Sequence, residues 1–284
     1  MSERMIDANG AELCVETFGD PSDPVVLLIG GGASSMDWWQ KEFCALLAED
    51  RHVIRYDLRD TGRSVSYPAG KPGYTHDDLA EDAVGILDAL AIETACLAGI
   101  SLGGGIAQRA AVAHPDRVSS LVLMSTSPGG PGGPGNDLPP MTPEVAASFA
   151  SEEPGPDTST KEGLFEAFLL GERMFAGARP VDEEELRELS YRVFARTKDI
   201  PASLYNHFAA AAGEEVRPRL GEIKAPTLVV HGTHDPLFPL GHAEALAREI
   251  PGARLLPLEG VGHQMPPKEF WGVVVAGIRE VSGG

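Results

Sequence analysis

Three side chains of the sequence have the types and the order needed for nucleophilic attack on a carbonyl group. Ser101 stands at the centre of a G-x-S-x-G pattern at residues 99–103, and Asp235 and His263 each follow a later apolar run. A serine hydroxyl is a weak nucleophile, so it needs a base within hydrogen-bond reach and an acid that orients the base. The pattern therefore predicts a Ser101–His263–Asp235 triad, in an order typical of one α/β architecture.

The same chemistry needs backbone donors for the negative oxygen of a tetrahedral intermediate. One donor is expected to be the amide of Leu102, where a helix begins directly after the serine. The second is expected from the glycines at 30–32, where Gly31 is preferred to Gly32. Glycine at this point lets the backbone approach a substrate closely.

The hydrophobic pattern predicts the elements that position these residues. An apolar strand before the serine, a sharp turn and a small-residue helix place Ser101 at the apex of a strand–turn–helix unit. Helical patterns alternate with the strands, the first of them from about Asp37 to Ala48. This alternation implies a mainly parallel sheet covered on both faces, with ligands bound at the carboxyl ends of the strands. The predicted strands are a hairpin around Asn9-Gly10 and the runs 25–29, 52–56, 95–98, 118–124, 226–230 and 254–258.

The composition changes after the sixth predicted strand. Residues 128–140, PGGPGGPGNDLPP, are rich in chain breakers, and residues 141 to about 220 have only helical patterns with acidic faces. We interpret this insert as a lid over the strand ends, whose linker could act as a hinge. The predicted organisation is a core at 1–128 and 221–284 with a helical lid at 129–220.

Apolar lid residues are candidates for a substrate pocket. They could line a pocket above the serine, or they could pack the lid helices against one another, which is the more usual role of an apolar helical stripe. The candidates are Phe165, Phe168, Met174, Phe175 and Phe208.

Other polar residues have simpler interpretations. His231 and His234 beside Asp235 could suggest a metal site, but an H-x-x-H pattern in a loop without a further ligand cluster is weak, and we predict no metal. Asp57 and Asp60 are expected to make loop hydrogen bonds with Arg59 and Arg63. Structural, packing or surface roles are expected for His52, His76, His114, His207 and His242.

Composition limits the classes of partner. Forty-two acidic against 23 basic residues give a net charge of −19, which argues against nucleic acid and anionic membrane surfaces. Three widely spaced cysteines form neither a disulfide framework nor a zinc pattern. No apolar run approaches the roughly 18 residues of a membrane span. We expect a cytoplasmic protein that acts on a small molecule; the oligomeric state is not encoded in any feature of the sequence.

Across nearly its whole length the sequence resembles the α/β-hydrolase superfamily. The resemblance rests on the glycines at 30–32, D-x-R-x-x-G-x-S at 57–64, G-x-S-x-G-G at 99–104, H-G-x-x-D at 231–235 and Gly262-His263. Within that superfamily it is most similar to the aclacinomycin methylesterase group, whose string is nearly that of RYDLRDTGRS at 55–64. Asp60 stands where the superfamily usually has glycine, and Ile29 replaces the usual histidine before the oxyanion glycine.

The resemblance implies an α/β-hydrolase fold with a mostly parallel eight-stranded sheet and a lid after the sixth strand. It implies a serine hydrolase that cleaves a carboxylic ester without a cofactor, with the methyl ester of a bulky polyketide-type natural product as the suggested substrate. A proline-type aminopeptidase or amidase, a lactonase, a perhydrolase and a carbon–carbon hydrolase would use the same triad. A hydrolase-fold ligand-binding protein is the non-enzymatic alternative.

Overall fold

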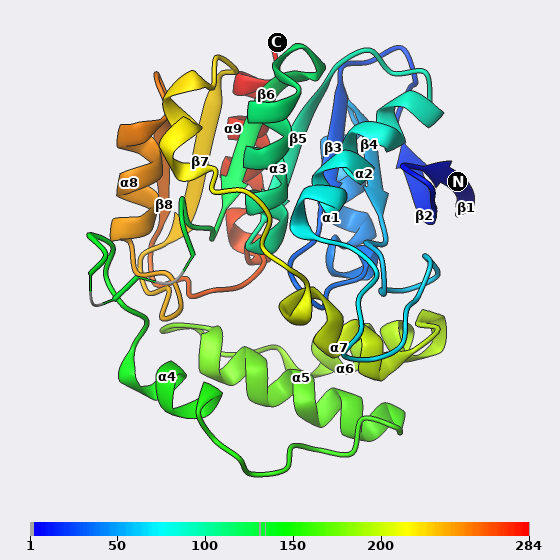
Figure 1. Cartoon of the computed structure of the whole chain (residues 1–284), viewed down its shortest axis with the longest axis vertical. Coiled ribbons are helices and arrows are strands. Elements are labelled where there is room, and N and C mark those ends of the chain that lie inside the picture. The colour runs from blue at the N-terminus through cyan, green and yellow to red at the C-terminus, as the bar shows by residue number, and fades with distance from the viewer. Residues whose placement is uncertain (1–2, 131, 134, 284) are drawn as a thin grey trace.

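The computed structural model describes residues 3–130, 132–133 and 135–283, so the predicted 128–140 linker includes two positions, 131 and 134, outside the described residues. The described chain forms an eight-stranded sheet in the order β1-β2-β4-β3-β5-β6-β7-β8 (Figure 1). The first hairpin and the β2–β4 pair are antiparallel, and all other pairs are parallel, which confirms the predicted sheet. The strands are β1 (Arg4–Ala8), β2 (Ala11–Phe18), β3 (Val25–Ile29), β4 (His52–Tyr56), β5 (Ala95–Ile100), β6 (Val118–Met124), β7 (Thr227–Gly232) and β8 (Arg254–Leu258).

Alternating side chains of the central strands divide the core into two apolar layers. Leu27 and Ile29 of β3 pack with α2, α3 and α8 on one face of the sheet. Val26 and Leu28 pack with α1 and α9 on the other face. Both faces are therefore buried, as expected for parallel strands. The helices are α1 (Lys41–Leu47), α2 (His76–Ala89), α3 (Leu102–Ala113), α4 (Pro143–Phe149), α5 (Lys161–Phe175), α6 (Glu183–Arg196), α7 (Ile200–Ala209), α8 (Gly241–Glu249) and α9 (Trp271–Val281).

One helix prediction is wrong in its extent. The single helix expected from about residue 37 to 48 is divided into a 3-10 turn at Met36–Trp38 and α1, with extended backbone at Trp39 between them. The buried guanidinium of Arg55 donates to the carbonyl oxygens of Met36 and Trp39. Because these carbonyl oxygens accept hydrogen bonds from a side chain of β4, the helix is interrupted at this point. The local helical pattern of the sequence cannot predict such an interruption.

Helices α4–α7, between β6 and β7, lie together at the lower side of the view in Figure 1. They contact the loops that follow the strands. The Thr142 amide donates to Pro236 O at 2.8 Å, the Lys198 amide to Gly62 O at 3.1 Å, and the His263 amide to Phe175 O at 2.7 Å. The helical segment predicted as a lid is thus in contact with the loops after β4, β7 and β8.

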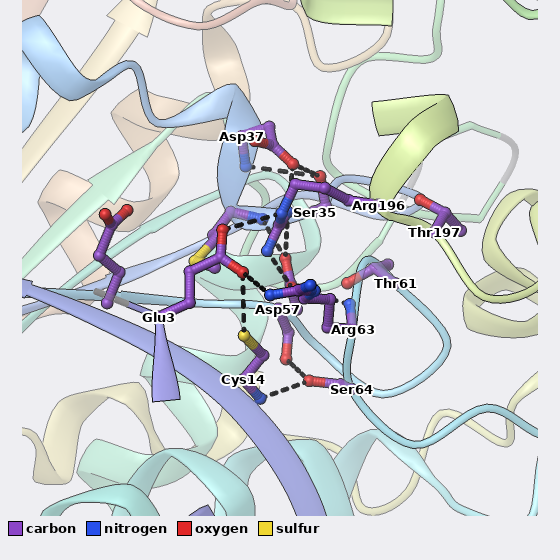
Figure 2. Close-up of polar contacts among 12 residues, drawn as sticks. Glu3, Cys14, Ser35, Asp37, Asp57, Thr61, Arg63, Ser64, Arg196 and Thr197 are labelled. Atoms are coloured by element: carbon purple, nitrogen blue, oxygen red, sulfur yellow. Dashed lines mark hydrogen bonds and ion pairs between the residues drawn. The ribbon is translucent and has the colours of Figure 1, made fainter. Parts of the chain in front are cut away.

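A buried ionic cluster attaches the end of α6 to the core (Figure 2). The Arg196 guanidinium contacts Asp57 at 2.8 Å and Glu3 at 3.0 Å, and it also pairs with Asp37. Burial raises the pKa of Asp57, and Arg196 opposes that effect. The prediction for Asp57 holds in part, because its carboxylate accepts the Arg63 backbone amide, but its charged partner is Arg196, which sequence pattern did not indicate.

Asp60 also has a structural role, with partners other than the two predicted arginines. Its carboxylate accepts hydrogen bonds from the Tyr74 hydroxyl at 2.7 Å and from the Asn206 amide at 2.9 Å. Arg59 pairs instead with Asp82 at 2.7 Å. Asp60 thereby links α7 to the loop after β4.

Within the described residues, no helix has the length and hydropathy needed to cross a bilayer.

Candidate active site

The turn between β5 and α3 places Ser101 in a strained conformation. Ser101 has φ 52° and ψ −117°, a region that L-residues rarely adopt. The flanking glycines are required by close contacts, because a Cβ on Gly99 would lie 2.1 Å from the Gly103 carbonyl oxygen. A Cβ on Gly103 would lie 2.5 Å from the carbonyl oxygens of Ile29 and Gly30. The turn is therefore compact enough to raise the serine side chain above the sheet.

Loops after β7 and β8 bring the two predicted partners to this serine. The His263 imidazole lies with Nε2 3.0 Å from Ser101 Oγ and Nδ1 2.8 Å from Asp235 Oδ2. In this geometry Nδ1–H donates to the carboxylate, and Nε2 accepts from the serine hydroxyl. The structure thus places the three predicted residues in one continuous hydrogen-bond chain, which fits a nucleophile, a base and an orienting acid.

Asp235 is held ionised by its surroundings. Burial favours the neutral acid, but His263 and His231 and the hydrogen bonds to the carboxylate outweigh it and hold the pKa of Asp235 below its ordinary value. Its second oxygen accepts the amides of Leu237 at 2.9 Å and Phe238 at 2.8 Å. These bonds fix the carboxylate plane, so it can orient an imidazole without losing its charge.

Two aromatic rings and one backbone bond hold His263 in place. Phe238 lies edge-on to the imidazole with ring centroids 5.3 Å apart, and Phe175 lies at 5.8 Å. Phe175, the last residue of α5, also accepts the His263 amide through its carbonyl oxygen. The position of the imidazole therefore depends on α5 as well as on the loops after β7 and β8.

The loop after β3 lies beside the serine. A Cβ on Gly31 would be 3.6 Å from the Ser101 Cβ, whereas a Cβ on Gly32 would be 2.9 Å from the Phe208 ring. Gly31 thus faces the serine and Gly32 faces Phe208 of α7. Leu102 opens α3, where the first amides of a helix have no intrahelical acceptor. This placement fits the preference for Gly31 and Leu102 as oxyanion donors.

His207 of α7 supports the loop that contains Gly31, and sequence reasoning assigned it no such role. Its Nδ1 accepts the Ala33 amide at 3.0 Å, and its Nε2–H donates to Arg59 O at 2.8 Å. Ala33 itself has a positive φ of 61°. Burial lowers the pKa of His207 to about 4, so the imidazole is neutral and can accept at Nδ1. No local signal marks this residue, which lies in the last turn of α7 and meets its partners only through the fold.

The five candidate pocket residues divide into two groups. Phe175 lies against His263 and Phe208 against Gly32, so both adjoin the site. Phe165 is only 3% exposed and belongs to the apolar cluster of α5 and α6, and Phe168 packs on that cluster and on Trp38. Met174 is partly buried near the end of α5. Phe165 therefore packs helices α5 and α6 against each other, as the alternative interpretation of the apolar residues expects.

Three other histidines make hydrogen bonds away from the serine. His231 is buried, donates from Nε2 to Phe238 O at 2.7 Å and lies 3.4 Å from Asp235. His234 instead bonds the Thr233 hydroxyl. His242 contacts the Ser127 hydroxyl at 2.9 Å and Pro139 O at 2.8 Å, so it joins both ends of the segment before α4. Among the described residues, no group of three or more His, Cys, Asp and Glu side chains could hold a metal ion.

Comparison with known proteins agrees with this architecture. A family model described as the alpha/beta hydrolase fold matches residues 23–267. The chain is 34% identical to rhodomycin D methylesterase DauP of Streptomyces sp. (strain C5), over 94% of this chain and 93% of that protein. It is 32% identical to a 2-hydroxymuconate semialdehyde hydrolase of Pseudomonas sp. (strain CF600), over 84% of this chain and 80% of that protein.

The fold is also similar to solved structures. An esterase from Exiguobacterium antarcticum superposes with a TM-score of 0.77 at 25% identity, covering 98% of this chain and 99% of that one. The family model and the identity to DauP over almost the whole length fit the strand order, the serine turn and the inserted helices described above. The chain therefore belongs to the α/β-hydrolase fold family.

Proposed function

We propose that this protein is a serine hydrolase that cleaves a carboxylic ester. The observation that carries the proposal is the hydrogen-bond chain from Ser101 through His263 to Asp235 at a strained turn. The identity to a methylesterase over nearly the whole chain supports an ester as the substrate.

The proposed reaction uses only groups of the chain, the ester and water. Ser101 Oγ attacks the ester carbonyl while His263 Nε2 takes its proton, and Asp235 stabilises the imidazolium. The amides of Gly31 and Leu102 bind the oxyanion. The alcohol leaves with the proton from His263, and an acyl-serine remains. Water, deprotonated by the same histidine, then releases the acid and restores the serine.

We propose the methyl ester of a bulky polyketide-type compound as the substrate class. Its support is the name of the relative, rhodomycin D methylesterase, together with a segment of four helices that contacts His263 and Gly32. We take this segment, α4–α7, as the lid, and Phe175 and Phe208 as pocket residues because they adjoin His263 and Gly32.

Two measurements test the ester hydrolase proposal. Ser101→Ala should lower turnover of methyl esters by roughly 10⁴-fold or more, because the nucleophile is lost while binding remains. A fluorophosphonate should label the wild-type protein and leave Ser101→Ala unlabelled. Equal turnover by the two proteins would contradict the mechanism, and absence of both labelling and turnover would favour a ligand-binding protein.

A carbon–carbon hydrolase is the second candidate, because a relative at 32% identity is a 2-hydroxymuconate semialdehyde hydrolase. Both reactions would use the same serine, so the substrate panel decides between them. Faster turnover of a 2-hydroxy-6-oxo-dienoate than of methyl esters would favour this second function.

We propose a cytoplasmic location. Its support is that Cys14, Cys44 and Cys96 are free and buried, which suits a reducing compartment. Fractionation of cells that express the full chain would test the location, and recovery with the membrane or the medium would contradict it.

A further inference from the structure

One buried histidine lies directly behind the proposed acid of the triad. His231 belongs to β7, four residues before Asp235, and its side chain is 0% exposed. Its Nε2 lies 2.7 Å from Phe238 O, so this nitrogen carries the proton and donates to the carbonyl oxygen. Burial lowers the pKa of His231 below its usual 6.5, and the ring is therefore neutral near neutral pH.

Packing alone does not explain a histidine at this position. Nδ1 of His231 is buried and has no partner among the described residues. A buried acceptor without a donor destabilises a fold, and an apolar side chain of similar size would fill the same space without that penalty. The reason for an imidazole therefore lies in the hydrogen bond that its other nitrogen makes.

That hydrogen bond closes a short turn, residues 235–238. Asp235 Oδ1 accepts the amides of Leu237 at 2.9 Å and Phe238 at 2.8 Å. Phe238 is thus held on both sides, its N–H by Asp235 and its C=O by His231. The same Nε2 of His231 lies 3.4 Å from Asp235 Oδ2, the oxygen that accepts from His263. His231 therefore contacts both ends of the turn.

Both ends of this turn act on one imidazole. Asp235 Oδ2 lies 2.8 Å from His263 Nδ1, and the Phe238 ring lies edge-on to the same imidazole, with ring centroids 5.3 Å apart and planes at 78°. The carboxylate sets the tautomer and the plane of the imidazole, and the ring limits its rotation. A displaced turn would therefore move His263 Nε2 away from Ser101 Oγ, which lies at 3.0 Å.

We propose that His231 is a positioning residue for the reaction: by holding the Phe238 carbonyl oxygen, it fixes the turn that presents Asp235 and the Phe238 ring to His263. The inference rests on the proposed ester hydrolase function and adds one residue to its machinery. Because its side chain is fully buried, His231 acts through these neighbours and not on the substrate. Its loss should slow the chemical steps and leave substrate binding nearly unchanged.

A purely structural role is the alternative. A residue that only stabilises the loop after β7 changes the fraction of folded protein, but not the rate or the titration of each folded molecule. Three titratable groups interact with the charge of His263, namely Asp235, Glu172 of α5 and His231. Replacing the neutral His231 by another neutral side chain removes no charge from this group. A changed titration of His263 would then report a changed geometry.

The test compares two side chains of the same length. His231→Gln keeps an N–H at the same number of bonds from Cα, and His231→Met removes it. Fluorophosphonate labelling gives the concentration of active sites, so that kcat is expressed per active serine. On methyl esters, His231→Met should lower kcat by about 10-fold or more and change KM by less than about 2-fold, whereas His231→Gln should retain at least about half of the wild-type kcat. His234→Met, at an exposed position of the same loop, should behave as wild type.

Titration of isotope-labelled histidine side chains by NMR adds a readout that needs no turnover. A carboxylate that accepts from an imidazole favours its protonated form, so a weaker bond to Asp235 should lower the midpoint of the His263 titration. His231→Met should lower this midpoint by about 0.5 pH unit or more relative to wild type, and His231→Gln should leave it unchanged. If no ester is hydrolysed while the midpoint moves in this way, the ester hydrolase proposal fails and the positioning role stands.

Four results would overturn the inference. They are equal losses in His231→Gln and His231→Met, a change in KM alone, a wild-type kcat in His231→Met, and a lower kcat in that variant without a shift of the His263 midpoint. Where His231→Met does not fold, His231→Asn takes its place with the same expectations, because its amide is one bond too short to reach Phe238 O.

Discussion

Glu172→Gln should stabilise the protein at alkaline pH and have a smaller effect at acid pH. The pKa of Glu172 is raised from 4.5 to about 7 in the folded chain, chiefly by desolvation. The folded state therefore binds a proton that the unfolded state has released between these two values. Stability associated with this group is fully present below pH 4.5 and is lost as the pH rises through about 7.

The size of the effect follows from the same shift. This rise in the pKa of Glu172 lowers the free energy of unfolding by about 3 kcal/mol at pH 8, where the carboxyl is ionised in both the folded and the unfolded state. At pH 5 it lowers that free energy by about 1 kcal/mol. Glutamine has a similar shape and no charge, so it removes the cost. The gain in free energy of unfolding for Glu172→Gln over wild type should thus be larger at pH 8 than at pH 5 by about 2 kcal/mol.

Urea unfolding followed by tryptophan fluorescence at both pH values measures this difference. Glu166→Gln is the matched control, because Glu166 lies on the same helix and is exposed. The control should behave as wild type at both pH values. A gain for Glu172→Gln that is equal at pH 5 and pH 8, or larger at pH 5, would refute the interpretation that desolvation of an unpaired carboxylate opposes folding.

Three further variants test the supports of the site. Arg196→Met should lower the free energy of unfolding by about 3 kcal/mol because it leaves the buried Asp57 without its cation; Arg219→Met, at the exposed pair with Glu222, should cost less than about 1 kcal/mol in the same urea titration. His207→Leu should lower kcat about 10-fold or more with a smaller change in KM, since the Ala33 amide loses its acceptor and the loop with the proposed oxyanion donor Gly31 loses its position; a KM effect alone would contradict that role. Gly103→Ala should abolish folding or lower Tm sharply, because its Cβ would lie 2.5 Å from two carbonyl oxygens, whereas Gly105→Ala, with open space, should raise Tm slightly.

Features that depend on local chemistry were predictable from the sequence. The turn at Ser101 needs Gly99 because of a backbone contact within the turn and Gly103 because of the carbonyl oxygens of Ile29 and Gly30. The G-x-S-x-G pattern marks both positions. Asp235 and His263 could be found because each follows an apolar strand, and parallel strands end at the same edge of the sheet. The two-faced core followed from the continuous apolar runs at β3, β5 and β6.

Features that depend on tertiary contacts were not predictable. His207 and Glu172 lie within helices. The groups that bond His207 and the imidazole of His263 that acts on the pKa of Glu172 come from segments more than 80 residues away in the chain. The break before α1 depends on Arg55, which reaches it from the next strand. Arg196 ends an ordinary helical pattern, and only the fold brings three carboxylates to it (Figure 2).

The hydrogen bond from the His263 amide to the Phe175 carbonyl oxygen attaches the proposed base to the last turn of α5. Movement of α5 would therefore change the position of this base. A bridge between Gly177 and Val261 joins the same two segments. If α4–α7 moved away from the sheet as one body, the backbone of the base would lose its support at the moment of substrate entry. Substrate therefore has to enter while the last turn of α5 stays in place. A crosslink that fixes this turn to the loop after β8 should accordingly leave turnover intact.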